Sequence, residues 1–543
     1  MQKRFIKLYN KRKKDLTMKQ LTPLESFINY KTDTDKQCGN YHIEIAELKE
    51  NEQYRFHFDM SVCIGCHCCE VACNEQNANS ADIKWRRVGE MEAGVFPNVK
   101  QLFNSMSCNH CIDPECLKGC PTNSYIKFEN GIVYHDDDVC IGCQYCTWNC
   151  PYEVPIFNPD RGIVTKCHMC YEKLDAKQTP ACVQACPAGA IEIEIVNVDK
   201  WLKSDIKKEG VAPHLPDISI TKPTTRYTLP KFNGDVKPVD EHILKPAHKE
   251  LPLIFMTIFS QISVGGFLAL FLGHILNIEF NLEKTNLWLA VMVFLPIAIG
   301  LPLSSLHLGR PIMAFSAMKN IKTSWLSREA LALGLYAFGV FLVVILYYFE
   351  IFGILMTLLQ ALVLSMGVYG IFAQSMIYRV KARPSWDRVS TTKRFFGSGY
   401  VGFLLVGFVM LLDGANESIM AILVLMLLFG GYQIYAIYKE VYFYKCLDVN
   451  SINFYQLNRT KKLLEEKFRK YKNIRLTSIV LFALVFPLFA IVFIVNESFV
   501  FALFLLFISI AGATVSELLG RYLFFVTVVP LGLAGNFFAG NQR

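Results

Sequence analysis

Residues 63–73 read CIGCHCCEVAC, and residues 140–150 read CIGCQYCTWNC. Both stretches contain cysteines with the spacing C-x2-C-x2-C-x3-C. In iron–sulfur proteins, three closely spaced thiolates bind one cubane and the fourth cysteine of such a run binds a different cubane. The two stretches therefore predict a domain that is organised around metal centres.

Two further groups of four cysteines follow the same plan, with middle gaps of four and eleven residues. Proline follows the closing cysteine of three of the groups, where the missing N–H turns the chain away from a helix. Four groups predict four [4Fe–4S] clusters in two pairs that exchange ligands. The groups are Cys63, Cys66, Cys69 and Cys73; Cys108, Cys111, Cys116 and Cys120; Cys140, Cys143, Cys146 and Cys150; and Cys167, Cys170, Cys182 and Cys186.

Zinc is the competing interpretation, because C-x2-C pairs also form zinc ribbons and fingers. Zinc needs only two such pairs per site, however, and it does not call for the repeated C-x3-C-P ending. Iron–sulfur clusters are therefore favoured, and a zinc-binding membrane scaffold stays a remote alternative. Cys38, Cys68 and Cys446 lie outside the groups and are expected to be inert.

The 543 residues divide into two parts of opposite character, because 18 of the 19 cysteines lie between Cys38 and Cys186 and the chain beyond about residue 251 is almost continuously apolar. This division excludes an ordinary soluble enzyme. It also excludes a small disulfide-stapled secreted protein, because the cysteine-rich part is too long. The net charge of +8 does not indicate nucleic-acid binding, because the basic residues lie in loops between apolar runs.

Eight apolar stretches are long enough to cross a bilayer, which takes about 20 helical residues. Buried helices of a soluble core would need polar faces that these stretches lack. The first begins only after residue 250, so none is expected to be a signal peptide. The stretches are 251–276, 285–306, 331–349, 351–377, 396–412, 418–438, 476–496 and 498–522.

Eight crossings place the cysteine-rich part and the C-terminus on the same side of the membrane. The connections on that side contain twenty Lys or Arg, whereas those on the opposite side contain only Lys284. Basic residues near membrane spans stay in the cytoplasm. We therefore expect a multi-pass protein of a bacterial inner (cytoplasmic) membrane, with the iron–sulfur domain and both termini cytoplasmic. Met1–Gln20, with eight Lys or Arg, is expected to be a membrane-surface arm, unless Met18 is the true start of the protein.

Residues 54–195 resemble the four-cluster subunit of the DMSO reductase family, through YRFHFDMSVCIGCHCCEVACNEQN, SCNHCIDPECLKGCP, DVCIGCQYCTWNCPYEVP and TKCHMCYEKL. The resemblance implies an α+β ferredoxin-like domain. In some relatives tryptophan replaces the third cysteine of the second group and a three-iron cluster results; Cys116 is present here, so four cubanes are expected. The implied ligand sets are Cys63, Cys66, Cys69 with Cys186; Cys167, Cys170, Cys182 with Cys73; Cys108, Cys111, Cys116 with Cys150; and Cys140, Cys143, Cys146 with Cys120.

The apolar part is similar to the eight-helix membrane anchor of the same enzyme, through SSLHLGRPIMAFSAMKNIKTSWLSREAL (304–331), YRVKARPSWD (378–387) and ELLGRYLFF (517–525). That anchor oxidises menaquinol, and the histidine of its HLG motif and the glutamate of its S-x-E motif form the quinol site. The matching residues are His307 and Glu329. An imidazole and a carboxylate at the membrane edge are suitable acceptors for the two protons that quinol oxidation releases. Two subunits are thus expected to be fused in one chain.

The resemblance implies an electron-transfer and anchor subunit that passes electrons from menaquinol to a separate molybdopterin-containing catalytic subunit in anaerobic respiration. The sequence contains no recognisable motif for molybdopterin, haem or flavin, so the terminal substrate site is not expected in this chain. Two alternatives stay open. In the first, electrons flow from a substrate-oxidising partner into quinone. In the second, the partner is a cytoplasmic enzyme of the nitrate reductase type. The best-known family members face the periplasm, but the loop charges of this chain favour a cytoplasmic iron–sulfur domain and hence a cytoplasmic partner.

These patterns divide the chain into four segments: a basic N-terminal extension (1–53), a four-cluster domain (54–200), a proline-rich linker (201–250) and an all-α membrane anchor of eight transmembrane helices (251–543). The six prolines of the linker favour an extended chain, which could also lie over a partner subunit.

Glu517 and Arg521 lie one helical turn apart in the last apolar stretch. Charges inside a bilayer are costly unless they are paired, and residues four apart on a helix can reach each other. We expect these two side chains to form a salt bridge.

Overall fold

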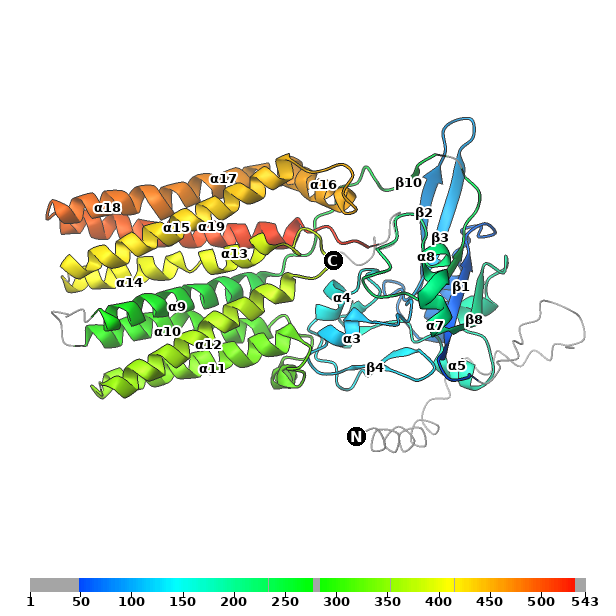
Figure 1. Cartoon of the computed structure of the whole chain (residues 1–543), viewed down its shortest axis with the longest axis horizontal. Helices are drawn as coiled ribbons and strands as arrows, with labels where there is room; N and C mark the ends of the chain where they lie inside the picture. The colour runs from blue at the N-terminus through cyan, green and yellow to red at the C-terminus, as the bar shows by residue number, and fades with distance from the viewer. Residues whose placement is uncertain (1–47, 233, 277–283, 352, 415, 533–543) are drawn as a thin grey trace, which may run out of the picture. The chain divides into compact units, whose positions relative to one another are not determined.

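The computed structural model describes residues 48–532 except 233, 277–283, 352 and 415. All of them belong to one compact unit, which begins at Ala46. A small α+β region that contains the cysteine groups is followed by an all-helical domain, as the sequence predicts (Figure 1). Most of the expected N-terminal extension, including Met1–Gln20 and Cys38, lies outside the described residues.

Two three-stranded sheets and two two-stranded hairpins form the β structure described in the cysteine-rich region. β1 (Glu52–Asp59) lies at the centre of one sheet, antiparallel to β8 (Ile191–Asn197) and parallel to β9 (Arg226–Thr228). In β8, isoleucines at alternate positions face the core while Glu192 is exposed, because successive side chains of a strand point to opposite faces. The second sheet has the order β10 (Val236–Pro238), β2 (Arg87–Ala93) and β3 (Lys100–Met106).

Short hairpins and helices accompany these sheets, and the helices contain Cys68, Cys69, Cys73, Cys116, Cys146 and Cys182. The hairpins are β4 (Tyr125–Lys127) with β5 (Val133–His135) and β6 (Ile156–Asn158) with β7 (Ile163–Thr165). The helices are α2 (Cys68–Gln76), α3 (Glu115–Gly119), α4 (Tyr145–Asn149), α5 (Tyr171–Asp175) and α6 (Ala181–Gln184).

The proline-rich segment 201–250 contributes strands to both sheets. β9 pairs with β1, and β10 pairs with β2 at a sheet edge, where a strand tolerates Pro238. Trp201 is fully buried, and its indole N–H donates to the carbonyl of Pro223 over 2.9 Å. The segment is therefore packed against the cysteine-rich region over part of its length before it reaches the membrane domain.

Among the described residues, eight helical segments are long and apolar enough to cross a membrane, in agreement with the sequence prediction (Figure 1). The third begins at Trp325, six residues before the expected start, so Glu329 lies within the helix. The spans are α9 (Leu251–Ile275), α10 (Thr285–Ser305), α11 (Trp325–Tyr348), α12 (Ile354–Tyr378), α13 (Val389–Gly397) with α14 (Tyr400–Asp413), α15 (Asn416–Lys445), α17 (Arg469–Val480) with α18 (Phe486–Val495), and α19 (Phe499–Val526).

Helix α9 lies at the centre of the bundle, packed against α10, α12, α14 and α19. Glycines allow its close approach to α14: a Cβ atom at Gly265 would lie 2.1 Å from the carbonyl oxygen of Gly399, and one at Gly402 would lie 2.1 Å from the amide nitrogen of Gly266. Small residues commonly serve this purpose where membrane helices cross.

Candidate functional site

Three small cavities in the cysteine-rich region are each lined by four cysteines. In each cavity, three closely spaced cysteines of one group meet the closing cysteine of another group. The three sets are Cys63, Cys66, Cys69 and Cys186; Cys108, Cys111, Cys116 and Cys150; and Cys73, Cys167, Cys170 and Cys182. The structure thus brings together the same residues that the resemblance to the family implies.

The remaining set is buried beside the first two hairpins. Cys120, Cys140 and Cys146 pack in one cluster with Val133 of β5 and residues of β7. Burial, followed by the nearby charge of Cys120, raises the pKa of the Cys143 thiol, so these two sulfurs are also neighbours. All four proposed ligand sets therefore converge in space.

The buried thiols fit a cationic metal centre. Burial raises the pKa of Cys69 and Cys182 to about 11 and that of Cys150 to about 12, because the thiolate form loses its hydration. A bound metal offsets this penalty, since it stabilises the thiolate. The thiols that converge in fours are therefore suited to bind metal ions, although each thiol is neutral when no metal is bound.

Backbone N–H groups point at the sulfurs. The N–H of Ala190 donates to Cys186 Sγ over 3.2 Å, and the N–H of Gly142 donates to Cys140 Sγ over 3.4 Å. Gly142 has a φ of 68°, in the region that favours glycine. Hydrogen bonds to sulfur stabilise thiolate ligands and adjust the reduction potential of an iron–sulfur cluster.

Arg86 is a buried cation beside two of the ligand sets. Its guanidinium donates to the hydroxyls of Ser105 over 3.2 Å and Ser107 over 2.9 Å. Burial acts to lower the pKa of Arg86, but the thiolates of Cys182 and Cys69 more than offset that effect and raise it. The guanidinium therefore stays charged at this position.

Replacing Arg86 with glutamine should lower the reduction potentials of the two clusters assigned to the Cys63 and Cys73 sets. Unit charges about 8 Å apart interact by roughly 2 kcal/mol at an effective dielectric constant of about 20, or on the order of 90 mV for one electron. Potentiometric titration followed by electron paramagnetic resonance measures this shift. Lys207→Gln, which removes an exposed positive charge, is the control. Unchanged potentials, or an equal shift of all four clusters, would contradict the assignment.

The connection between α10 and α11 (residues 306–324) lies directly on the cysteine-rich region. The backbone N–H of Arg310 donates to the carbonyl of Ile141 over 3.1 Å, and the Asn320 amide donates to the carbonyl of Cys120 over 2.8 Å. Gly309 approaches Gly162 so closely that a Cβ atom would lie 2.1 Å from its carbonyl oxygen. The segments that carry Cys120 and Cys140 thus contact the membrane domain.

His307 begins this connection. Its Nδ1 hydrogen-bonds to the carbonyl oxygen of Ser304, the residue three positions earlier. Because a carbonyl only accepts, Nδ1 carries the proton and Nε2 is the acceptor of the neutral ring. Burial lowers the pKa of His307, partly offset by this hydrogen bond and by the charge of Glu250. The ring is therefore neutral at pH 7 and able to accept a proton at Nε2.

Glu329 lies in the first turns of α11, at the other end of the same connection. It is 5% exposed, and its Oε1 accepts a hydrogen bond from the Gln374 amide over 2.9 Å. Within the described residues, no direct hydrogen bond joins His307 and Glu329. No sequence motif marks Gln374; the available signal was an amide in a mostly apolar helix, and Gln360 of the same helix gives the same signal.

Aromatic side chains fill the junction between α4 and the membrane helices. The ring centroid of Trp148, which lies between Cys146 and Cys150 in sequence, is 5.8 Å from that of Tyr378 and 5.4 Å from that of Trp386. These contacts fasten the helix that precedes Cys150 to the ends of α12 and α19.

A cavity of about 530 Å³ lies beside this aromatic junction, and Trp148, Glu250 and Trp386 are among its lining residues. Its size is in the usual range of small-molecule pockets. The charge of Glu250, a lining residue of this cavity, also acts to raise the pKa of His307, although burial outweighs it.

The predicted salt bridge between Glu517 and Arg521 is replaced by contacts to other helices. Glu517 accepts hydrogen bonds from Ser398 over 2.8 Å and from Gln433 over 3.1 Å. Arg521 donates to Gln261 of α9 over 3.0 Å. Inside a bundle, partners on neighbouring helices compete with the residue one turn away on the same helix.

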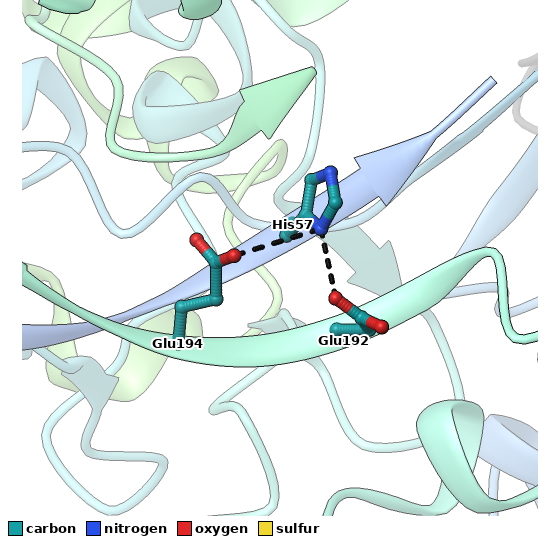
Figure 2. Close-up of side chains that lie close together, drawn as sticks. All are labelled: His57, Glu192 and Glu194. Carbon is teal, nitrogen blue, oxygen red and sulfur yellow. Dashed lines mark hydrogen bonds and ion pairs between the residues drawn. The ribbon is translucent and has the colours of Figure 1, made fainter. Parts of the chain in front are cut away.

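A second group of potential metal ligands, His57, Glu192 and Glu194, lies on β1 and β8 (Figure 2). His57 Nδ1 is 2.9 Å from Glu192 Oε2 and 3.6 Å from Glu194 Oε1. Arg55 and Arg226 both form ion pairs with Glu194. Because two guanidinium groups already neutralise the Glu194 carboxylate, these three residues form a poor metal site. Their hydrogen bonds and ion pairs instead hold neighbouring strands together.

Comparison with known proteins agrees with the two-part structure. Residues 244–526 match the profile of the family described as DMSO reductase anchor subunit (DmsC), and residues 99–195 match that of a 4Fe-4S dicluster domain. One chain of the anaerobic dimethyl sulfoxide reductase of Haemophilus influenzae is 36% identical over 181 residues, which cover 32% of this chain and 87% of that protein. The Escherichia coli K12 protein of the same name is 39% identical over 179 residues, with coverages of 32% and 86%. One subunit of the sulfite dehydrogenase of Allochromatium vinosum is 34% identical over 196 residues, with coverages of 32% and 81%.

The cysteine sets and the eight helices define an iron–sulfur electron-transfer domain joined to a multi-pass membrane anchor. The chain belongs to the DMSO reductase family, and it carries the iron–sulfur part and the DmsC-type anchor in one polypeptide. The predictions of an iron–sulfur domain and of a fused eight-helix membrane anchor are thus both confirmed. Because the similar proteins are each named as one chain or subunit of an enzyme, a catalytic partner subunit is implied.

Proposed function

We propose that this chain oxidises menaquinol at a membrane and passes the electrons to a separate molybdopterin-containing catalytic subunit during anaerobic respiration. The contact between connection 306–324 and the segments that carry Cys120 and Cys140 is the observation that supports this proposal most directly. It brings the connection that joins the proposed quinol-site residues against one proposed ligand set.

His307 and Glu329 are the proposed proton acceptors. The neutral imidazole of His307 has Nε2 available, and the Glu329 carboxylate has one oxygen held by Gln374 and a second oxygen that can take up a proton. Two acceptors match the two protons that a quinol releases when it is oxidised.

The sixteen grouped cysteines are the proposed ligands of four [4Fe–4S] clusters. When they are bound, such clusters accept one electron at a time, so the two electrons of a quinol would be passed on in two successive transfers. The cysteines converge in fours, and buried N–H groups point at their sulfurs, which supports this assignment.

We further propose that the iron–sulfur domain is cytoplasmic in a bacterial inner membrane. The excess of Lys and Arg in the connections on that side supports this orientation. A cytoplasmic partner of the nitrate reductase type is compatible with the same orientation.

A second candidate function runs electrons in the opposite direction, from a substrate-oxidising partner into quinone. The similarity to a sulfite dehydrogenase subunit favours keeping this candidate. The two directions are distinguished by the reduction potentials of the clusters relative to menaquinone, since electrons flow toward the higher potential.

Reduction by quinol tests the proposed function. Reduced menaquinone added anaerobically to membranes that contain the chain and its partner should bleach the brown colour and produce paramagnetic signals of reduced iron–sulfur clusters. Dithionite gives the total reducible amount as the reference. Metal analysis that finds zinc without iron would support the zinc scaffold, and clusters that dithionite reduces but quinol does not would contradict quinol oxidation.

A further inference from the structure

A row of buried hydrogen bonds connects Glu329 to Arg521 across four helices. The Gln374 amide nitrogen of α12 donates to Glu329 Oε1 over 2.9 Å, and the Gln261 amide nitrogen of α9 donates to Gln374 Oε1 over 2.9 Å. Arg521 Nη2 of α19 donates to Gln261 Oε1 over 3.0 Å. The row therefore begins at a guanidinium and ends at the carboxylate of the proposed quinol site.

Each member of the row is almost completely enclosed by the bundle. Glu329 and Arg521 are each 5% exposed, Gln261 is 1% exposed and Gln374 is 0% exposed. A polar group that loses its partner in such a position is strongly destabilising, because neither water nor lipid tails replace the missing hydrogen bond. These groups are therefore strongly constrained to keep the partners they have.

The two ends of the row fix the direction of its hydrogen bonds, because the Arg521 guanidinium only donates and the Glu329 carboxylate only accepts. A side-chain amide can turn over and exchange its oxygen and nitrogen, so its orientation depends on its neighbours. A guanidinium has only donors, so Gln261 must turn its oxygen toward Arg521 and its nitrogen toward Gln374. Gln374 must then accept with its oxygen and present its nitrogen to Glu329.

Arg521 can fix this direction because its charge is not committed to Glu517. Glu517 is held by Ser398 and Gln433, and the Arg521 guanidinium carbon lies 3.6 Å from the centre of the Phe395 ring. A cation over an aromatic face is stabilised without an anionic partner. Its N–H groups therefore remain available to Gln261.

We propose that Arg521 is a positioning residue of the quinol site and acts on Glu329 through Gln261 and Gln374. The row holds an N–H donor against Glu329 Oε1, which orients the carboxylate and leaves Oε2 as the atom that receives a proton. This inference rests on the proposed quinol oxidation at Glu329.

Gln261→Glu tests the proposal with little change in side-chain size. The new carboxylate still accepts from Arg521, but it has no N–H for Gln374. The Gln374 oxygen then loses its 2.9 Å donor and keeps only the longer contact with the Ser260 hydroxyl, at 3.4 Å. We expect kcat for quinol oxidation by the complete membrane-bound complex to fall about tenfold or more, the usual effect of one lost hydrogen bond to a charged group, while KM for quinol stays within about twofold. Arg521→Met should have the same effect, and Arg521→Lys, which keeps a donor-only cation, should restore most of the rate.

Gln433→Leu is the matched control, because it removes an equally buried amide that contacts Glu517 and not the row. Its quinol oxidation should be close to that of the unmodified protein, and dithionite-reducible iron should be equal in all variants. Combining Gln261→Glu with Arg521→Met should give no greater loss than either change alone, since both interrupt the same row.

The outcomes separate this inference from the proposed function. If Glu329→Gln leaves quinol oxidation unchanged, the proposed site itself fails. If Glu329→Gln abolishes oxidation while Gln261→Glu and Arg521→Met both retain the normal kcat, the positioning role of Arg521 is overturned and the site stands. If Arg521→Lys loses as much activity as Arg521→Met, a donor-only cation is insufficient and the inference is equally overturned.

Discussion

The Glu329→Gln variant is expected to lose quinol-driven reduction of its iron–sulfur clusters while the clusters themselves assemble normally. The amide has nearly the same shape as the carboxylate and can still contact Gln374, but it cannot accept a proton at neutral pH. Loss of one acid–base group typically slows a reaction by about 100-fold to 10,000-fold. The initial rate of cluster bleaching after addition of reduced menaquinone measures this effect.

Glu350→Gln provides the control for this experiment, because Glu350 is exposed just beyond the opposite end of α11. Menaquinol should reduce the clusters of this variant at the normal rate. Dithionite should reduce the clusters of both variants to the same extent. Normal quinol-driven reduction in Glu329→Gln would reject the proposed site and would direct attention to the cavity lined by Glu250 and Trp148.

The Cys116→Ser variant is expected to lose one cubane and to keep the other three. Cys116 lines one cavity with three other cysteines, and a serine hydroxyl is a poor replacement for a thiolate ligand of iron. The site is expected either to be empty or to retain a three-iron remnant. Iron analysis and electron paramagnetic resonance of the anaerobically purified complex measure the loss.

Cys68→Ser is the control, because Cys68 is exposed and lies among the cysteines of the first group without belonging to a ligand set. Its iron content should equal that of the unmodified protein. An unaltered iron content in Cys116→Ser would overturn the ligand assignment, and loss of all four clusters would show that this site is needed for the whole domain to fold.

Local sequence patterns were sufficient to predict the membrane-spanning helices. Apolar runs predicted the eight spans, because each run is itself long enough to cross a bilayer. The start of α11 was missed because residues 325–330 include polar side chains that are buried by neighbouring parts of the protein: the Ser327 hydroxyl, for example, donates to the carbonyl of Ala317 over 2.5 Å.

The sequence patterns did not predict which segments far apart in the chain pair with each other. The residues of β9 pair with β1 from a position about 170 residues later in the chain, and nothing in the sequence of the proline-rich segment indicates that partner. The contacts of Arg521 show the same limit within the membrane, because the preference for a partner four residues away ignores the glutamine that α9 presents. Cysteine spacing was more informative, since the ligands of a cluster impose their own regularity on the chain.

Segment 201–250 has a consequence for assembly, because it contributes one strand to each three-stranded sheet before the chain enters α9. Redox module and anchor are made in equal stoichiometry, and neither has to find the other by diffusion. The translational entropy that two free subunits lose on docking is largely avoided, so even modest contacts at connection 306–324 give an enduring junction. The implied catalytic subunit would then dock onto a redox module and an anchor that are already joined.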